Sequence, residues 1–292
     1  MAHPFRAFLA GCALGLLSPA LRAGGESTPA HKRTALNLRS AEALVLDQRT
    51  GEVLYDKQGE TLAPMASITK LMTAMVVLDA NLDLKEELRI EKADVDTLRH
   101  SKSRLPVGTR LTRGEALLLA LLASENRAAH ALGRTYPGGL TACVAAMNAK
   151  AQALGLKRTR YEDPTGLDGG NVATARELAT IVDTAHRYPV IRDFSTRGEA
   201  EIGSGRRRIA FLNTNGLTRN HRWTIGLSKT GYLEEAGKCL VMQTNLAGRA
   251  LVIVLLDSWG KYTRLGDAAR IRQWLEGPAP AAVRTSRRKR RG

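Results

Sequence analysis

The chain has 292 residues, of which 43% are hydrophobic and 25% are charged, with a formal net charge of +16. One core of moderate size, with room for a subdomain, accounts for this composition. Aromatic residues are only 4% of the chain, and no phosphate-binding loop, dinucleotide fingerprint or metal-type spacing of histidines occurs, so a nucleic-acid reader, a nucleotide enzyme and a metalloenzyme are all disfavoured.

The N-terminus predicts a secretory signal peptide over residues 1–23. An apolar run follows Arg6, stops before Pro19 and is succeeded by small residues suited to cleavage. The run is too short for a membrane span. A lipoprotein-type cleavage before Cys12 is the alternative, weakened because the apolar run continues beyond that cysteine. We therefore expect a periplasmic protein, soluble or loosely membrane-associated, with residues 24–36 as a linker.

Two cysteines stay in the exported chain. Cys143 and Cys239 each lie in an apolar stretch, without the spacing of metal ligands. We expect two buried free thiols, and a disulfide between them is the alternative.

The C-terminus predicts a disordered basic tail over residues 278–292. Pro278 and Pro280 separate the last helix from RTSRRKRRG, which carries six positive charges. Such a tail could contact anionic envelope polymers or lipid headgroups, and weak nonspecific attraction is the simplest expectation. No specific nucleic-acid partner is expected.

The first half of the chain predicts a hairpin and then helices. Two β-like runs over residues 41–56 flank a turn at Gly51. Apolar spacing then predicts helices over 67–80, over 112–123 with a capping box, from the Ser124 turn to about Arg134, and over 141–154.

The second half predicts one further helix and a β-rich end. A second capping box, formed by Thr174 and Glu177, opens a helix, and two β-like runs follow it. Strands are expected over 226–234, 239–246 and 250–258, and an amphipathic helix over 267–276. The fold class is α/β in the layered α+β sense: an antiparallel sheet built from both chain ends, flanked by helices, with a mostly helical second lobe and a cleft between.

Three short motifs occur in order along the chain. They are Ser67-Ile68-Thr69-Lys70, Ser124-Glu125-Asn126 and Lys229-Thr230-Gly231, expected at a helix start, in a turn between helices and on a strand. Each has an ordinary structural explanation as a cap, a solvated charge or an edge strand. Their joint occurrence favours an active site.

The first two motifs supply a nucleophile and the groups that handle its proton. The Ser67 hydroxyl needs a base, and Lys70 could serve if its pKa falls through burial, the positive end of its helix and a second cation at Lys229. Ser124 could relay a proton to the leaving group, and Asn126 could point into the same cleft. Glu125 is expected to be structural or solvent-facing.

The third motif suits substrate binding. Lys229 offers a positive charge, Thr230 a hydroxyl, and Gly231 close approach of a substrate backbone. The amides of Ser67 and Tyr232 could form an oxyanion hole.

Over residues 37–277 the sequence resembles low-molecular-mass penicillin-binding proteins, the serine DD-peptidases of the bacterial cell wall. The segments LLLALLASENRAAHALGRTYPGG, MNAKAQALGL, DPTGLDGGNVATARELA, LNTNGL and GKYTRLGDAARIRQWLE are most similar to the D-alanyl-D-alanine endopeptidase branch, the penicillin-binding protein 7 type. The resemblance implies a DD-peptidase/β-lactamase-like fold and a catalytic domain over 37–277.

The resemblance also implies an activity. Ser67 would be acylated by a D-alanyl peptide bond with Lys70 as base, Ser124 and Asn126 would transfer the proton and hold the substrate amide, and Lys229 and Thr230 would anchor the substrate. The substrates implied are D-alanyl-diaminopimelyl cross-links of peptidoglycan, β-lactams are implied as covalent inhibitors, and no cofactor or metal is implied.

Three rival functions remain. A D-alanyl-D-alanine carboxypeptidase would use the same residues. A class A β-lactamase would need a glutamate for deacylation, and Glu162 lacks the surrounding E-x-x-L-N pattern. A non-catalytic envelope-binding protein on this fold would not need to keep all three motifs.

Overall fold

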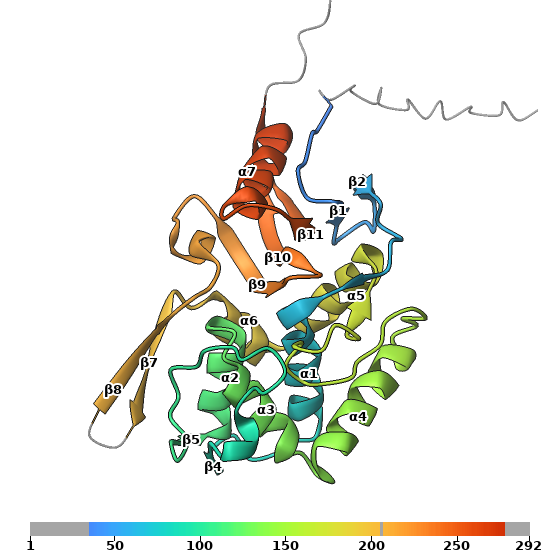
Figure 1. The fold of residues 1–292 in the computed structure, drawn as a ribbon. Coiled ribbons are helices and arrows are strands. Elements are labelled where there is room, and N and C mark those ends of the chain that lie inside the picture. Colours follow the sequence, from blue (N-terminus) through green and yellow to red (C-terminus); the bar gives the residue numbers. More distant parts are fainter. Residues whose placement is uncertain (1–34, 205–206, 278–292) are drawn as a thin grey trace, which may run out of the picture. The chain divides into compact units, whose positions relative to one another are not determined.

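The computed structural model describes residues 35–204 and 207–277. Its main sheet has five antiparallel strands in the order β2-β1-β11-β10-β9 (Figure 1). The strands come from both ends of the described chain: β1 (Glu42–Asp47), β2 (Val53–Lys57), β9 (Thr224–Leu233), β10 (Gly237–Leu246) and β11 (Arg249–Ser258). The predicted sheet built from both ends is confirmed, and β9, which carries the K-T-G motif, is an edge strand.

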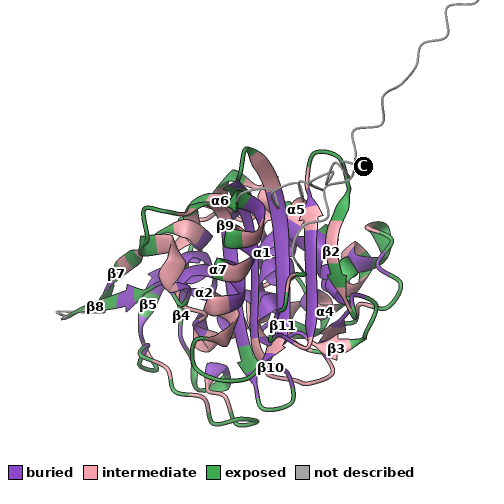
Figure 2. Cartoon of the chain, turned by 90° about the horizontal axis from the view of Figure 1, so that it is seen from above, coloured by how far each residue is buried: buried purple, intermediate pink, exposed green. Residues whose placement is uncertain are grey.

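Helices cover both faces of this sheet. The apolar side of α7 (Thr263–Glu276) packs on one face through Ala268, Ile271 and Leu275. The other face packs against α5 (Ala175–His186) and the helical lobe. The central strands are consequently buried on both sides, as Figure 2 shows, which explains why β10 and β11 read as nearly continuous apolar runs.

The helical lobe surrounds one buried helix. This helix, α1 (Lys70–Asp79), is buried over most of its length. The other helices of the lobe are α2 (Arg113–Leu122), α3 (Asn126–Arg134), α4 (Gly139–Ala153) and α6 (Pro189–Thr196). Both the β-rich part and the predicted helical lobe are therefore present, and the fold class is confirmed.

Several short elements were not predicted. They are the 3-10 helices η1 (Ala66–Thr69), η2 (Lys92–Asp94) and η3 (Gly216–Arg219), and the strand pairs β3 (Ala63–Pro64) with β6 (Val172–Ala173) and β4 (Glu87–Arg89) with β5 (Arg110–Thr112). The two β-like runs after α5 form the hairpin of β7 (Glu199–Ser204) and β8 (Arg207–Leu212). Elements of two to four residues carry too little periodicity to be recognised in a sequence.

The two predicted capping boxes have different outcomes. At α2 the box is complete, because the Glu115 amide donates to the Thr112 hydroxyl at 3.1 Å and the Thr112 amide donates to the Glu115 carboxylate at 2.7 Å. At α5 only the Thr174 hydroxyl caps the helix, and the Glu177 carboxylate instead accepts from the Arg158 amide at 2.9 Å. The prediction of a full second box was wrong, since a neighbouring loop competes for its carboxylate.

Both cysteines are buried and free, so the disulfide alternative is wrong. Burial raises the pKa of the Cys143 and Cys239 thiols to about 12. The predicted signal peptide, linker boundary and basic tail lie in residues 1–36 and 278–292, nearly all outside the described residues, and stay predictions.

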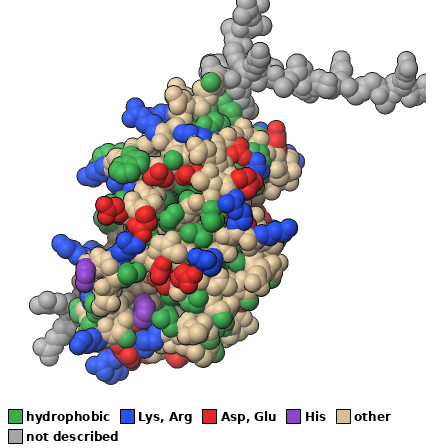
Figure 3. Space-filling view, turned by 45° about the vertical axis from the view of Figure 1, so that its right-hand side comes forward, with side chains coloured by type: hydrophobic (Ala, Val, Ile, Leu, Met, Phe, Trp, Pro, Cys, Tyr) green, Lys and Arg blue, Asp and Glu red, His purple; other side chains and the backbone are tan. Residues whose placement is uncertain are grey.

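The described surface carries charges of both signs. On the face in Figure 3, acidic and basic side chains are interspersed, without the continuous basic surface that nucleic acid prefers. No helix within residues 35–204 and 207–277 is long and apolar enough to cross a membrane. The same residues hold no group of three or more side chains suited to a metal ion.

Candidate active site

Ser67 and Lys70 meet at the junction of η1 and α1. Ser67 lies in the 3-10 turn, Lys70 is the first residue of the α-helix, and the Lys70 Nζ–Ser67 Oγ distance is 2.8 Å. Ala66, just before the serine, has a φ of +48°, a strained conformation for a residue with a side chain. The Ser67 hydroxyl does not cap the helix. The structural explanation of this serine as an N-cap was therefore wrong.

Lys70 is a buried amine with three oxygen partners. Besides Ser67, its Nζ donates to Asn126 Oδ1 at 2.8 Å and to the Thr165 carbonyl at 2.5 Å. Burial lowers its pKa to about 7, against the opposing charges of Asp163 and Glu125. An amine with this pKa can accept a proton at neutral pH.

The second serine–lysine pair joins distant segments. Ser124 lies in the turn between α2 and α3 with a φ of +58°, and Lys229 Nζ lies 2.8 Å from its Oγ. The same amine donates to the Thr230 carbonyl at 2.8 Å. Burial, then the charges of Lys70 and Arg264, place the pKa of Lys229 well below the usual lysine value.

Burial lowers the pKa of Lys70, as expected, and the charge of Lys70 adds to the effect of burial on the pKa of Lys229. Two buried amines that repel each other hold fewer protons than two separate lysines.

Asn126 is fixed at both ends of its amide. Its Oδ1 accepts from Lys70, and its Nδ2 donates to Ser101 Oγ at 2.8 Å. Ser101 belongs to the loop between η2 and β5, and its backbone amide donates to Asp96 at 2.8 Å. Ser101 was missed, because only the tertiary fold brings this loop to the α2–α3 turn.

The K-T-G strand passes very close to the nucleophile. A Cβ atom on Gly231 would lie 3.1 Å from the Ser67 amide nitrogen and 3.0 Å from the Ala66 Cβ, so a side chain here would crowd the turn that carries the nucleophile. The Thr230 hydroxyl lies 2.6 Å from the Thr214 hydroxyl. Tyr232 follows on the same strand with 60% of its surface exposed.

A loop that the motif search missed supplies the Thr165 carbonyl. Asp163 binds this loop together by accepting from the Gly166 amide at 2.7 Å and from the Thr165 hydroxyl at 2.5 Å. The amide of Asn171 bridges Asp163 to Thr69 of η1, with distances of 2.7 and 3.1 Å. The signal was present in the segment DPTGLDGGN, whose Asp, Gly and Asn are typical of a tightly bonded turn.

Two glutamates near the motifs have structural surroundings. Glu125 is only 7% exposed and caps α3 by accepting from the Arg127 amide at 3.1 Å, so it is structural as expected but does not face solvent. Glu162 forms a surface ion pair with Arg160 at 2.9 Å. A surface pair of this kind does not suit the deacylating glutamate of a class A β-lactamase.

Arg264 in the first turn of α7 is an unpredicted cation near this cluster. Its Nε and Nη1 atoms are buried and have no hydrogen-bond partner within the described residues. Its charge contributes to the lowered pKa of Lys229. Two buried guanidinium nitrogens without partners suit an anionic ligand group.

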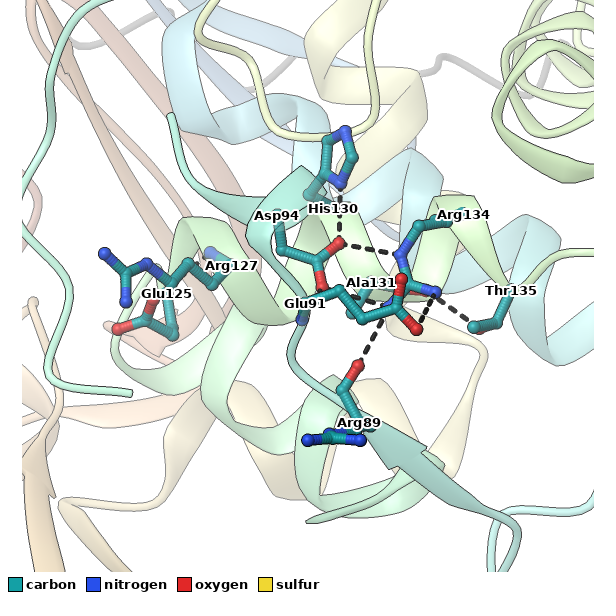
Figure 4. A network of polar contacts seen from close by, with 9 residues as sticks. All are labelled: Arg89, Glu91, Asp94, Glu125, Arg127, His130, Ala131, Arg134 and Thr135. Carbon is teal, nitrogen blue, oxygen red and sulfur yellow. Dashed lines mark hydrogen bonds and ion pairs between the residues drawn. The ribbon is translucent and has the colours of Figure 1, made fainter. Parts of the chain in front are cut away.

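A separate ionic network holds the helix that carries Asn126 (Figure 4). The buried Asp94 carboxylate lies 2.8 Å from His130 Nδ1 and accepts from Arg134 Nε at 3.0 Å. These contacts tie η2 to α3 and lower the pKa of Asp94 against the effect of its burial. His130 is thus a packing residue, as expected for the histidines.

An antiparallel sheet against a helical lobe, with a serine–lysine pair at the start of the central helix and K-T-G on the edge strand, is the arrangement of the serine DD-peptidase class. A family model for peptidase S11, described as D-alanyl-D-alanine carboxypeptidase, matches residues 28–259. The chain therefore belongs to the peptidase S11 family.

Similar proteins carry related names. The chain is 48% identical over 248 residues to a D-alanyl-D-alanine endopeptidase of Pseudomonas aeruginosa, covering 84% of this chain and 80% of the relative. It is 41% identical over 286 residues to a D-alanyl-D-alanine endopeptidase of Escherichia coli K12, covering 96% and 92%.

Two solved structures of DD-peptidases have a similar fold. The Streptomyces K15 DD-transpeptidase superposes with a TM-score of 0.77 at 28% identity, over 82% of this chain and 98% of the other. A D-alanyl-D-alanine carboxypeptidase from Mycobacterium tuberculosis H37Rv superposes with a TM-score of 0.76 at 29% identity, over 86% and 96%.

Proposed function

We propose that this protein is a serine DD-endopeptidase that hydrolyses D-alanyl-diaminopimelyl cross-links of peptidoglycan through an acyl-enzyme on Ser67, and that β-lactams acylate the same serine. The observation that carries the proposal is the 2.8 Å contact between the Ser67 hydroxyl and a buried Lys70 amine whose pKa is lowered to about 7. The names of the similar endopeptidases support this choice of bond.

In the first step the Ser67 oxygen attacks the carbonyl carbon of the D-alanyl residue while Lys70 Nζ takes the hydroxyl proton. The amides of Ser67 and Tyr232 stabilise the negative oxygen of the tetrahedral intermediate, a contribution of about 3 kcal/mol per donor. Their closeness depends on Gly231, which lets β9 approach the Ser67 amide.

The leaving group departs as an amine. Ser124 Oγ gives a proton to the leaving nitrogen, the carbon–nitrogen bond breaks, and the Lys229–Ser124 contact at 2.8 Å holds the donor in place. The proton that Lys70 took from Ser67 then passes to the Ser124 oxygen, so that Lys70 is neutral again. In deacylation Lys70 takes a proton from water as the water oxygen attacks the ester, and this proton goes to Ser67 Oγ when the ester bond breaks. Asn126 orients the substrate amide, and Lys229, Thr230 and Arg264 attract the carboxylate of the residue that leaves.

Export by a signal peptide over residues 1–23 and a periplasmic site of action belong to this proposal, because peptidoglycan lies outside the cytoplasmic membrane. The basic tail over residues 278–292 is proposed to make weak contacts with anionic envelope components.

The test uses the mature chain and a fluorescent penicillin, followed by intact-mass measurement. We expect one stable adduct on the wild-type protein and none on Ser67→Ala. If folded wild-type protein gains no mass and leaves the drug intact, this result would contradict the peptidase function and favour a non-catalytic envelope-binding protein.

A second assay separates endopeptidase from carboxypeptidase, which would use the same residues. Purified cross-linked muropeptide dimers and uncross-linked pentapeptides are incubated with the enzyme, and the products are resolved by chromatography. Monomers released from dimers support the proposal, whereas release of terminal D-alanine alone supports the carboxypeptidase named in the family description.

A further inference from the structure

Next to the serine–lysine cluster lies a groove of about 310 Å³. Its lining residues come from three segments of the chain: Lys102, Arg104, Ala123, Glu125, Phe211 and Leu212. Neither Ser67 nor Lys70 lines it, so it is a space beside the proposed catalytic centre rather than part of it.

The groove adjoins Ser124 on two sides. Ala123 and Glu125, which line it, are the residues on either side of Ser124 in the chain. From Leu212, which also lines the groove, the chain runs to Thr214, whose amide donates to the Leu122 carbonyl at 3.1 Å and whose hydroxyl contacts Thr230. The groove therefore lies beside the Ser124 turn and beside the segment that contacts Thr230.

The groove combines positive charge with an apolar wall. Lys102 and Arg104 are exposed, and Glu125 is the single acid that lines the space, with its carboxylate engaged at the α3 N-terminus. The Arg104 guanidinium lies 5.4 Å from the centre of the Phe211 ring, a cation–π contact that orients its donors in advance. This arrangement suits an extended ligand that carries carboxylates.

We propose that this groove binds the acidic peptide stem on the leaving side of the scissile bond, with Lys102 and Arg104 as its carboxylate partners. The inference rests on the proposed endopeptidase function. Ser124 is the proposed proton donor to the leaving nitrogen, so the leaving nitrogen lies at Ser124 and its substituent extends beyond it. In a cross-link that substituent is a diaminopimelyl stem with free carboxylates, whereas in a carboxypeptidase substrate it is one D-alanine, too short to fill the groove.

The experiment compares two substrates on one double variant. Lys102→Gln/Arg104→Gln removes both charges and keeps polar side chains of similar reach, and Arg49→Gln/Lys157→Gln removes two exposed charges elsewhere as a matched control. We expect kcat/KM for a cross-linked muropeptide dimer to fall about tenfold through a higher KM, because two charge-assisted contacts are lost. Acylation by fluorescent penicillin, which has no leaving stem, should stay within about twofold for both variants.

A second comparison tests the charge partner directly. Dimers whose leaving-stem carboxyls are amidated should be poor substrates for the wild-type enzyme and no poorer for the groove variant, because the interaction energy is then already lost. Equal kcat/KM of the groove variant and the wild type on the acidic dimer would overturn the inference, as would an equal loss in penicillin acylation. Failure of the wild type itself to cut the dimer, with normal penicillin acylation, would instead contradict the endopeptidase function on which the inference rests.

Discussion

The two serine–lysine pairs have the same contact distance but different origins. Ser67 and Lys70 are three residues apart and meet within one helical turn, while Ser124 and Lys229 are 105 residues apart and meet only where the α2–α3 turn reaches β9; both contacts are 2.8 Å. Both rely on a residue with positive φ, Ala66 next to the first serine and Ser124 itself in the second pair. Strained backbone at both places indicates that the surrounding fold holds the Ser67 and Ser124 hydroxyl groups in a particular orientation.

The comparison predicts that breaking the two pairs lowers the rate of acylation by penicillin to different extents. The largest effect is expected for Lys70→Met, which removes the base and keeps the length of the buried side chain. Penicillin acylation should slow about a thousandfold, since general-base catalysis of a hydroxyl is lost. Stopped-flow or gel-based adduct kinetics measures the rate, and Lys157→Met, an exposed lysine elsewhere, serves as the control. A loss below about tenfold would assign the base to another group.

The second pair is broken with Ser124→Ala. We expect acylation to fall about a hundredfold, less than for Lys70→Met, because the proton donor is lost while nucleophile and base remain. Ser124→Gly is the matched variant: it also lacks the hydroxyl but accommodates the φ of +58° without strain. It should be as slow as the alanine variant and more stable by about 1 kcal/mol in thermal unfolding. A fast glycine variant would show that backbone conformation, rather than the hydroxyl, matters at this position.

Gly231→Ala tests the close approach of β9 to the turn that carries Ser67. The added methyl group would press on the Ser67 amide nitrogen and the Ala66 Cβ and move β9 away from the nucleophile. We expect an acylation rate lower by about tenfold to a hundredfold, consistent with loss of one oxyanion donor. At Gly203, in β7, an added Cβ meets no atom within 4 Å, so Gly203→Ala is the control. Equal rates for both variants would contradict the tight approach.

The smallest expected effect is the pH dependence of the intact enzyme. Lys70 has a folded-state pKa of about 7, so its neutral, proton-accepting form increases as pH rises through that value. Acylation kcat/KM for penicillin should rise by about tenfold from pH 6 to pH 8 and then level off. A profile that is flat over this range, or that rises only above pH 9, would contradict a buried amine as the base.

Much of the site was predictable because three short sequence motifs contain its reactive residues. Ser67, Lys70, Ser124, Asn126 and Lys229 were all selected from the sequence. In the structure hydrogen bonds join Lys70 to Ser67 and Asn126, and a second contact joins Lys229 to Ser124. What escaped prediction were the Thr165 carbonyl and Ser101, which lie in loops, and Arg264 in the first turn of α7, whose Nε and Nη1 atoms have no hydrogen-bond partner among the described residues. These groups carry no periodic or motif signal, since any residue can supply a carbonyl and many serines and arginines lie on surfaces.

By itself, the sequence determined the local elements and the reactive groups. Apolar periodicity set the main helices and strands, and helical spacing alone places Ser67 within reach of Lys70. Only the tertiary structure decided how far the Lys70 pKa falls, which partners orient Asn126, and where a basic groove opens beside Ser124. The physical reason is that burial, charge coupling and cavities depend on surfaces assembled from distant segments, whereas hydrogen bonding within one helical turn depends only on neighbours in the chain.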